Sequence, residues 1–311
     1  MAIRTPMLAF WSLVMVTLIW GIGFVVVDDA INTMPVNTFN AFRFGIAALV
    51  LLPLCFINKK QQLQEASYQL KSLLKTGFGL GLLLFLGFSL QTSGMLYTSV
   101  SNTGFITGLA VPLVPVTGVL IFRKKVGLNV WLSALLATIG LYYLTIGDKL
   151  ELNSGDIMVA FAATCYAIHI TLTAKLSHHF PVMPLSVAQL AAVAIYSTLT
   201  TMSESLLGFN SNYPPLINQL GDLSVWSAII YSAVLASAFA YWAQTASQRL
   251  LEPHKVALIF ALEPIFAYCA AVIVLNEHLG LKGIIGASLI IGAMLYSELG
   301  GKKDKVKAIS L

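Results

Sequence analysis

Ten apolar segments, each about twenty residues long, follow one another through the 311-residue chain and constrain its fold more than any other feature. A bilayer core about 30 Å thick is crossed by about 20 helical residues. Because unpaired backbone groups are too costly in lipid, only helices and closed barrels cross it. Apolarity is continuous here rather than alternating, which excludes the barrel. The predicted spans are residues 8–27, 36–57, 74–97, 101–122, 128–146, 155–175, 184–207, 224–247, 254–274 and 281–299.

Composition supports lipid as the solvent. Hydrophobic residues make up 58% of the chain and charged residues 10%, and the mean hydropathy is +0.83. Soluble proteins carry charge on about a quarter of their residues. The first segment is long enough to span and has no cleavage site before Asp28, so we expect it to be retained. Cys55, Cys165 and Cys269 are isolated and form no disulfide framework or metal motif.

The charges predict an orientation. With the N-terminus inside, fifteen of the eighteen Lys and Arg residues fall in cytoplasmic segments, while Lys149 and Lys282 lie outside and Arg43 lies within a span. The fifteen are Arg4, Lys59, Lys60, Lys71, Lys75, Arg123, Lys124, Lys125, Lys175, Arg249, Lys255, Lys302, Lys303, Lys305 and Lys307. We therefore expect a multi-pass protein of the bacterial inner membrane with both termini in the cytoplasm. The net charge is +5, and the charged residues lie in short clusters between the apolar segments. The basic C-terminal tail is better explained by binding to anionic lipid than by binding to nucleic acid.

A weak internal repeat divides the chain into residues 1–150 and 151–311. At an offset of 152 residues Pro112 aligns with Pro264, and at an offset of 146 Trp20 aligns with Tyr166. Each half holds five predicted helices, an odd number, so the second half enters the membrane the other way up. The fold class predicted is therefore all-α and integral to the membrane, with two inverted five-helix repeats around a central cavity.

Several short motifs carry a family resemblance over nearly the whole chain. They are Trp20-Gly21, Asn40–Phe44, Gln91-Thr92, Tyr97-Thr98, Gly104–Leu109, Gly155-Asp156, Ala257–Phe260, Glu263–Ala267 and Asn276-Glu277. In this order and spacing they resemble the EamA-type family of the drug/metabolite transporter superfamily. The resemblance implies ten helices, both termini inside, and a central cavity lined by both halves. It also implies transport of small organic solutes, often export of amino acids or amines, in some members with proton exchange.

Two charged residues lie deep in predicted spans, where each costs roughly 2.5–3.5 kcal/mol or more. Glu263 lies about 13 Å from the cytoplasmic end of its span, at 1.5 Å per residue, and precedes Pro264, which bends helices. Its carboxylate could bind a substrate ammonium or carry a proton, or it could be a structural group satisfied by a neighbouring helix. Arg43 could bind a substrate carboxylate, or it could extend outward to Asp28 or Asp29.

Other candidates for substrate binding are polar or aromatic residues at similar depth. His169 has an ordinary pKa near 6.5 and is a second proton-coupling candidate, although such histidines often only bond a neighbouring helix. Gln189 aligns with Arg43 in the repeat, which suggests matching gates. Trp20 and Tyr166 are expected to face each other across the cavity, where they would suit amines or apolar side chains, or else simply pack. Gln91 and Trp242 complete the set.

Three prolines are predicted hinges: Pro112 and Pro115 in the span 101–122, and Pro264 in the span 254–274. The motifs HExxH of zinc proteases and GxSxG of serine hydrolases do not occur in the sequence, and no cluster of His, Asp and Glu lies at one depth. The Walker A phosphate-binding loop of ATP-driven pumps is also missing. We therefore predict no catalytic residue, no metal and no cofactor.

These observations predict a secondary transporter that exports small organic metabolites, such as amino acids or amines, by alternating access with protons as a candidate coupling ion. Its partners would be that solute and membrane lipid. An importer or facilitator of a vitamin or an amine is the alternative in the same class. An intramembrane enzyme or scaffold is a distant alternative, because enzymes need several reactive groups at one depth. The sequence leaves the substrate, the direction and the oligomeric state open.

Overall fold

Helices are the only regular elements in the described part of the chain. The computed structural model describes residues 3–57, 70–98, 100–123, 126–145, 153–209, 213–275 and 281–309. The unbroken long helices are α1 (Pro6–Ile31), α5 (Leu70–Met95), α8 (Leu128–Thr145), α9 (Ser154–Leu176), α10 (Val182–Leu206) and α16 (Leu281–Ile309). Two short elements, η1 (Ser177–His179) and α11 (Leu216–Gln219), lie between them. The all-helical prediction is confirmed.

Four predicted spans are divided. The pieces are α2 (Val36–Leu51) and α3 (Leu54–Ile57), α6 (Val100–Gly108) and α7 (Ala110–Phe122), α12 (Leu223–Ala233), η2 (Val234–Phe239) and α13 (Ala240–Ser247), and α14 (Pro253–Phe260) and α15 (Glu263–Leu275). Proline explains three of these breaks, because its ring removes an N–H from the helical ladder. The proline is Pro53 in the first, Pro112 in the second and Pro264 in the last. By contrast, α7 continues through Pro115.

Seven helices among the described residues are long and apolar enough to cross a membrane, and two further apolar helices are shorter. The seven are 6–24, 36–56, 70–95, 102–122, 154–179, 182–206 and 223–247, and the shorter ones are Leu128–Leu144 and Leu281–Ser297. Large apolar side chains face outward on them, for example Leu120 at 72% and Leu199 at 60% exposure. Such a surface matches lipid rather than water. The total of ten crossings stays a prediction.

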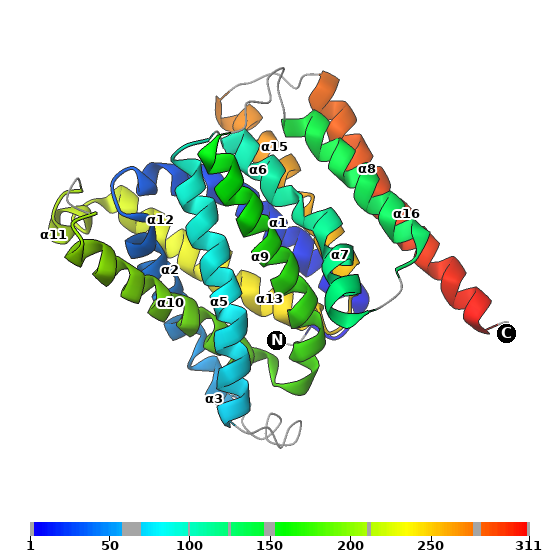
Figure 1. Cartoon of the computed structure of the whole chain (residues 1–311), viewed down its shortest axis with the longest axis horizontal. Coiled ribbons are helices and arrows are strands. Elements are labelled where there is room, and N and C mark those ends of the chain that lie inside the picture. The colour runs from blue at the N-terminus through cyan, green and yellow to red at the C-terminus, as the bar shows by residue number, and fades with distance from the viewer. Residues whose placement is uncertain are drawn as a thin grey trace.

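Close helix contacts depend on small residues. A Cβ on Gly81 of α5 would lie 2.7 Å from the carbonyl oxygen of Gln189 on α10. A Cβ on Gly140 of α8 would lie 2.8 Å from the carbonyl oxygen of Gly286 on α16. Glycine therefore brings these helix backbones together, as in other membrane helix pairs. Figure 1 shows α8 and α16 side by side at one edge of the bundle.

Several helix pairs join the first half of the chain to the second half. Helix α5 packs on α9 and α10, while the corresponding segment of the second half, α12 to α13, packs on α1 and α2. Two pairs, α2 with α10 and α8 with α16, join corresponding helices of the halves. The helix breaks also correspond, because α6 ends at Gly108 and α14 ends at Phe260, 152 residues later. These pairings are the ones that a duplicated, inverted unit would make, although the repeat itself stays a prediction.

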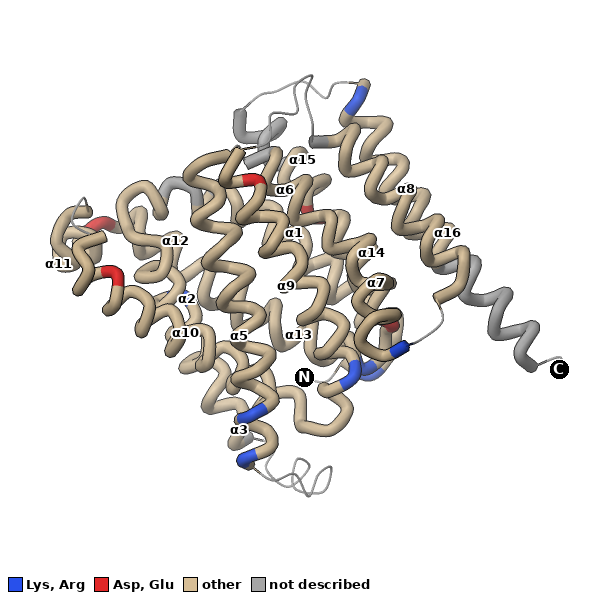
Figure 2. The backbone as a smooth tube through the Cα atoms, in the orientation of Figure 1, with Lys and Arg blue, Asp and Glu red and all other residues tan. Residues whose placement is uncertain are grey.

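Charge is distributed unevenly along the bundle. Figure 2 shows most of the described Lys and Arg residues at the end where α5 begins and α7 and α9 end, while Lys282 at the start of α16 lies at the other end. The residues at this end include Lys71, Lys75, Arg123, Lys175 and Arg249. Lys59, Lys60, Lys124, Lys125, Lys149 and the motif Asn276-Glu277 lie outside the described residues, as do the side chains of Lys302, Lys303, Lys305 and Lys307. We call the end of the bundle where α5 begins and α7 and α9 end the basic face.

Candidate functional site

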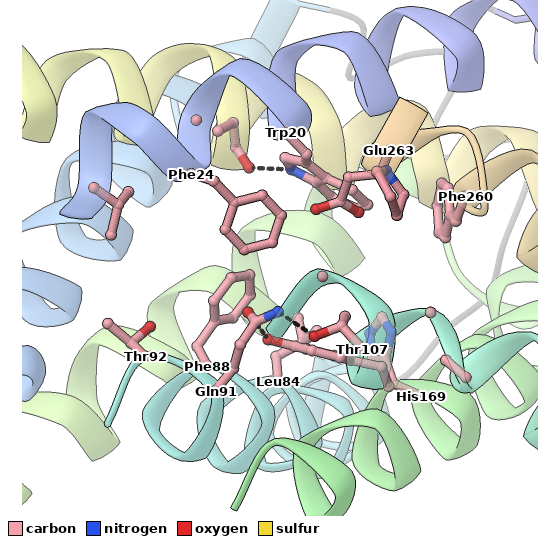
Figure 3. A pocket seen from close by; sticks show the side chains of 18 of the residues that line it. Trp20, Phe24, Leu84, Phe88, Gln91, Thr92, Thr107, His169, Phe260 and Glu263 are labelled. Carbon is pink, nitrogen blue, oxygen red and sulfur yellow. Dashed lines mark hydrogen bonds between the residues drawn. The ribbon is translucent and has the colours of Figure 1, made fainter. Parts of the chain in front are cut away.

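A cavity of about 120 Å³ lies inside the bundle. Binding sites for drug-sized ligands have volumes of roughly 300–1,000 Å³. The smaller volume of this cavity suits a small metabolite instead. Helices from both halves contribute to it: α1, α2, α5, α6, α7 and α9, and the segments α12 to α15. In Figure 3, Trp20, Phe24 and Glu263 face Phe88 and Gln91 across this space. We call it the central cavity.

Arg43 of α2 lines the central cavity and is only 5% exposed. Its Nε donates to Ser237 Oγ at 2.7 Å, and one Nη donates to the carbonyl oxygen of Ala236 at 3.4 Å. The guanidinium carbon lies 4.9 Å from the ring centre of Phe44 and 4.6 Å from that of Phe88. No carboxylate of the described residues lies within 4.0 Å of it. Arg43 is therefore a buried cation with unused N–H donors and no ion-pair partner in that part of the chain.

The Arg43 side chain points into the bundle. The polar contacts of the guanidinium lie inward, on the second half of the chain, rather than at the outer end of α1. The side chains of Asp28 and Asp29, the alternative partners, lie outside the described residues.

The partners of Arg43 belong to η2, a π-helical turn between α12 and α13. Such a turn contains an extra residue, leaves carbonyl groups less regularly paired, and is frequent at functional sites. The carbonyl oxygen of Ala236 accepts from Trp20 Nε1 at 2.8 Å as well as from Arg43. Tyr231, one turn earlier, donates from its hydroxyl to the carbonyl oxygen of Ile19 at 2.7 Å. The turn thereby joins α1 and α2 to the second half of the chain.

Glu263 opens α15 at the break after α14 and lines the central cavity. No salt bridge of 4.0 Å or less joins Glu263 to Arg43 or to another cation of the described residues. Glu263 nevertheless lies near enough to Arg43 for an electrostatic interaction. Among the described lining residues, the Glu263 carboxyl group and the Arg43 guanidinium thus face the same space without direct contact.

A hydrogen-bonded chain forms the wall opposite Trp20. The Tyr166 hydroxyl donates to Gln91 Oε1 at 3.0 Å, and Gln91 Nε2 donates to Thr107 Oγ1 at 2.8 Å (Figure 3). This chain connects α9, α5 and α6. Tyr166 is thereby bonded to the side of the cavity that holds Gln91; the predicted pairing of Trp20 with Tyr166 across the cavity stays a prediction.

His169 lines the central cavity, but Gln189 does not. Gln189 is fully buried, and its Oε1 lies 2.8 Å from His169 Nε2. Thr173 Oγ1 lies 3.3 Å from the same nitrogen. Gln189 thus orients His169 from behind, whereas its repeat partner Arg43 faces the cavity itself. Of the residues predicted to touch substrate, Gln189 is placed one layer away.

Trp242 also lies outside the cavity lining, and its neighbour Tyr241 lies inside it. The Trp242 ring packs against Phe239, with 6.0 Å between ring centres. Tyr241 is 3% exposed, and its ring centre lies 5.9 Å from that of Trp20. One helical residue turns a side chain by about 100°, so adjacent positions face different surroundings. The polarity of Tyr241 was the signal that could have identified it.

Two of the three predicted hinge prolines are near the cavity. Pro264 lines it beside Glu263, and Pro112 follows the break at Leu109. Pro115 lines a separate, larger space toward the basic face. Gly104 and Gly108, which the sequence presents as a helix-packing motif, line the central cavity. A Cβ on Gly104 would meet nothing within 4 Å.

Comparisons with known proteins agree over almost the full length. The model of the EamA-like transporter family matches residues 7–146 and again residues 153–297. An uncharacterized transporter of Archaeoglobus fulgidus is 30% identical over 297 residues, covering 93% of this chain and 85% of the relative. The uncharacterized transporter YoaV of Bacillus subtilis is 23% identical over 303 residues, covering 95% and 98%.

A solved crystal structure shares the fold, with a TM-score of 0.74 over 95% of this chain and 98% of the other. Its sequence identity is 14%, so the likeness concerns the fold alone. Taken with the two family matches and the apolar helices, these findings describe a multi-pass membrane transporter. The chain belongs to the EamA-like transporter family.

Proposed function

We propose that this protein is a secondary transporter that exports small zwitterionic metabolites, amino acids above all, across the bacterial inner membrane. One observation carries the proposal: Arg43 and Glu263 face one aromatic-walled cavity, and neither has an ion-pair partner within 4.0 Å among the described residues. An uncompensated charge in a membrane is expensive. A zwitterion supplies both missing partners, a carboxylate for Arg43 and an ammonium for Glu263.

The walls favour an apolar side chain on that zwitterion. The rings of Trp20 and Phe260 lie 5.0 Å apart, and those of Phe88 and Tyr166 lie 5.5 Å apart. Aromatic surfaces bind apolar groups by burial and ammonium groups by cation–π attraction. A facilitator for amines is the second candidate, favoured by the same walls together with Glu263. Arg43 opposes it, because a guanidinium repels a solute that carries only positive charge.

Alternating access would depend on the corresponding helix breaks. Gly108 and Phe260 end α6 and α14 next to the cavity, and Pro112 and Pro264 follow. The repeated family match supports two inverted units that rock against each other, with ten crossings in all. The basic face supports cytoplasmic termini. Proton exchange would use Glu263 as the proton site, with His169 as a second candidate.

Uptake and counterflow in proteoliposomes test the substrate class. The probes are L-leucine, its decarboxylated analogue isoamylamine, and its deaminated analogue 4-methylpentanoate, each measured with and without a pH gradient. We expect saturable counterflow of L-leucine and at least tenfold weaker competition by either analogue. Equal competition by isoamylamine would instead support the amine facilitator. Failure of a panel of amino acids to bind or to exchange would contradict the proposal.

Ser237 is expected to position Arg43 for the carboxylate. In Ser237→Ala the Nε donor loses its partner, and a hydrogen bond to a charged group contributes roughly 1.5–3 kcal/mol. We therefore expect about tenfold weaker binding of L-leucine, measured by radioligand binding, with rescue by Ser237→Thr. Ser227→Ala, whose hydroxyl bonds only within α12, should bind normally. Normal binding by Ser237→Ala would show that η2 does not position the guanidinium.

A further inference from the structure

A second cavity of about 1040 Å³ lies between the central cavity and the basic face. It is formed by α7, α8 and α9 and by the connection from α13 to α14. We call this space the vestibule. Its volume would hold a metabolite together with its water shell.

Only one helical turn separates the vestibule from the central cavity. On α7, Val111 lines the central cavity and Val114 lines the vestibule. The same change occurs between Gln244 and Gln248 at the end of α13. A turn of helix is about 5.4 Å long, so only a thin layer separates the two spaces.

This layer is closed by few polar contacts. Gln248 Nε2 donates to the carbonyl oxygen of Ile170 at 2.8 Å, which joins α13 to α9. Gln244 is 2% exposed, and its Oε1 has no hydrogen-bond partner among the described residues. An unpaired polar atom of this kind, on the side of the central cavity next to the layer, can bond a polar solute that crosses it.

The vestibule is lined by more positive than negative groups. Arg123, Lys175 and Arg249 line it, and Glu252 is the acidic side chain among its described lining residues. Glu252 lies 3.5 Å from His254, also in the lining. Cytoplasmic faces of membrane proteins are generally basic, but this rule does not require the charges to surround a cavity. Lys71 and Lys75 also lie on the basic face, but they do not line the vestibule.

We infer that the vestibule is the entrance chamber of the transport path and that its basic residues attract the solute through its carboxylate. The inference rests on the proposed function for the direction of travel and for the charge of the solute. A cleft of one sign of charge with low-dielectric walls raises the local concentration of the opposite charge. The thin layer at Gln248 would then separate capture from binding at Arg43 and Glu263.

Thiol labelling tests the field in the vestibule without any substrate. Ala174→Cys places one thiol on the vestibule wall, in a chain whose Cys55, Cys165 and Cys269 are replaced by alanine. Anionic and cationic methanethiosulfonate reagents are compared, with each rate divided by the rate on free cysteine. We expect the anionic reagent to be favoured about tenfold. At 1 M salt, where the Debye length is about 3 Å, the preference should largely vanish.

Matched charge reversals identify the source of the field. Arg249→Glu and Lys175→Glu should each lower the preference for the anionic reagent, whereas Lys75→Glu on the same face should not change it. Equal normalised rates for the two reagents, or equal effects of Lys75→Glu and Arg249→Glu, would overturn the inference. The result does not depend on transport, so it distinguishes failure of the vestibule from failure of the proposed substrate class.

An anionic lipid headgroup is the alternative ligand for the basic residues of the vestibule. The labelling is therefore repeated in nanodiscs of phosphatidylcholine alone and of phosphatidylcholine with phosphatidylglycerol. We expect the same preference in both. Loss of the preference with phosphatidylglycerol would mean that an anionic headgroup fills the vestibule, which would overturn its role as an entrance for solute.

Discussion

Arg43→Gln is expected to weaken binding of L-leucine about a hundredfold or more while leaving the protein as stable as before, or more stable. Removing one member of a buried charge pair in an interface costs roughly 2–5 kcal/mol of binding. Without ligand, however, Arg43 has two hydrogen bonds and no ion pair within 4.0 Å among the described residues. Loss of the charge removes its desolvation cost, which offsets the loss of these two hydrogen bonds.

The two readouts separate a binding role from a structural one. Radioligand binding gives the dissociation constant, and thermal unfolding in detergent gives the stability of the empty protein. Lys71→Gln, an exposed cation on α5, serves as the control and should change neither. A large fall in Tm for Arg43→Gln with unchanged binding would assign Arg43 to the structure and remove it from the site.

Glu263→Gln is expected to show the opposite charge preference to Arg43→Gln. The variant should lose affinity for L-leucine but gain relative preference for 4-methylpentanoate, because the carboxylate no longer repels an anion. In the double variant with Arg43→Gln the losses should be less than additive, since both residues bind one ligand. Asp222→Asn keeps a helix cap on the surface and serves as the acidic control. Additive losses would place the two charges in separate sites.

The sequence predicted the helices well because length and apolarity are sufficient to define a span. Most predicted and observed ends agree within a few residues, for example 155–175 against Ser154–Leu176 for α9, but α16 continues to Ile309, ten residues beyond the predicted end at 299. Proline indicated two of the breaks, at Pro112 and Pro264, since its chemistry is local. By contrast, α7 continues through Pro115, and the break at Pro53 was not predicted. The π-helical turn η2 could not be predicted, because Val234–Phe239 contains no proline or glycine. Its geometry depends on packing against Trp20 and Arg43, which are about 200 residues away.

Candidate site residues could be identified from the sequence where a polar side chain in an apolar segment is energetically costly. Arg43, Glu263, Gln91 and His169 stand out in apolar segments, and all four line the central cavity. The rotation of each helix was not accessible from the sequence, because lipid-facing and core-facing sides of these spans are both apolar. Gln189 was therefore assigned to the cavity although it lies behind His169. For the same reason the sequence does not distinguish glycines that join helices from glycines that leave room for a ligand.

Gly81→Leu and Gly104→Leu are therefore expected to fail in opposite ways. A Cβ on Gly81 would lie 2.7 Å from the carbonyl oxygen of Gln189, so a leucine forces α5 away from α10. Overpacking of this kind costs about 1–3 kcal/mol or more, and Tm should fall. A Cβ on Gly104 meets nothing within 4 Å, so the same leucine extends into the central cavity. It should occupy the space of the solute and leave Tm unchanged.

Tm and L-leucine counterflow are therefore both measured on each variant, because the two measurements together separate a loss of stability from a blocked cavity. Gly104→Leu should reduce counterflow more than tenfold at normal Tm, because several added carbons fill a cavity of only about 120 Å³. Gly79→Leu is the control, since Gly79 on α5 has no neighbour within 4 Å and does not line the cavity. If Gly104→Leu transports normally, the solute does not pass between α6 and Trp20. The central cavity would then be a packing defect, and the path through the bundle would lie elsewhere.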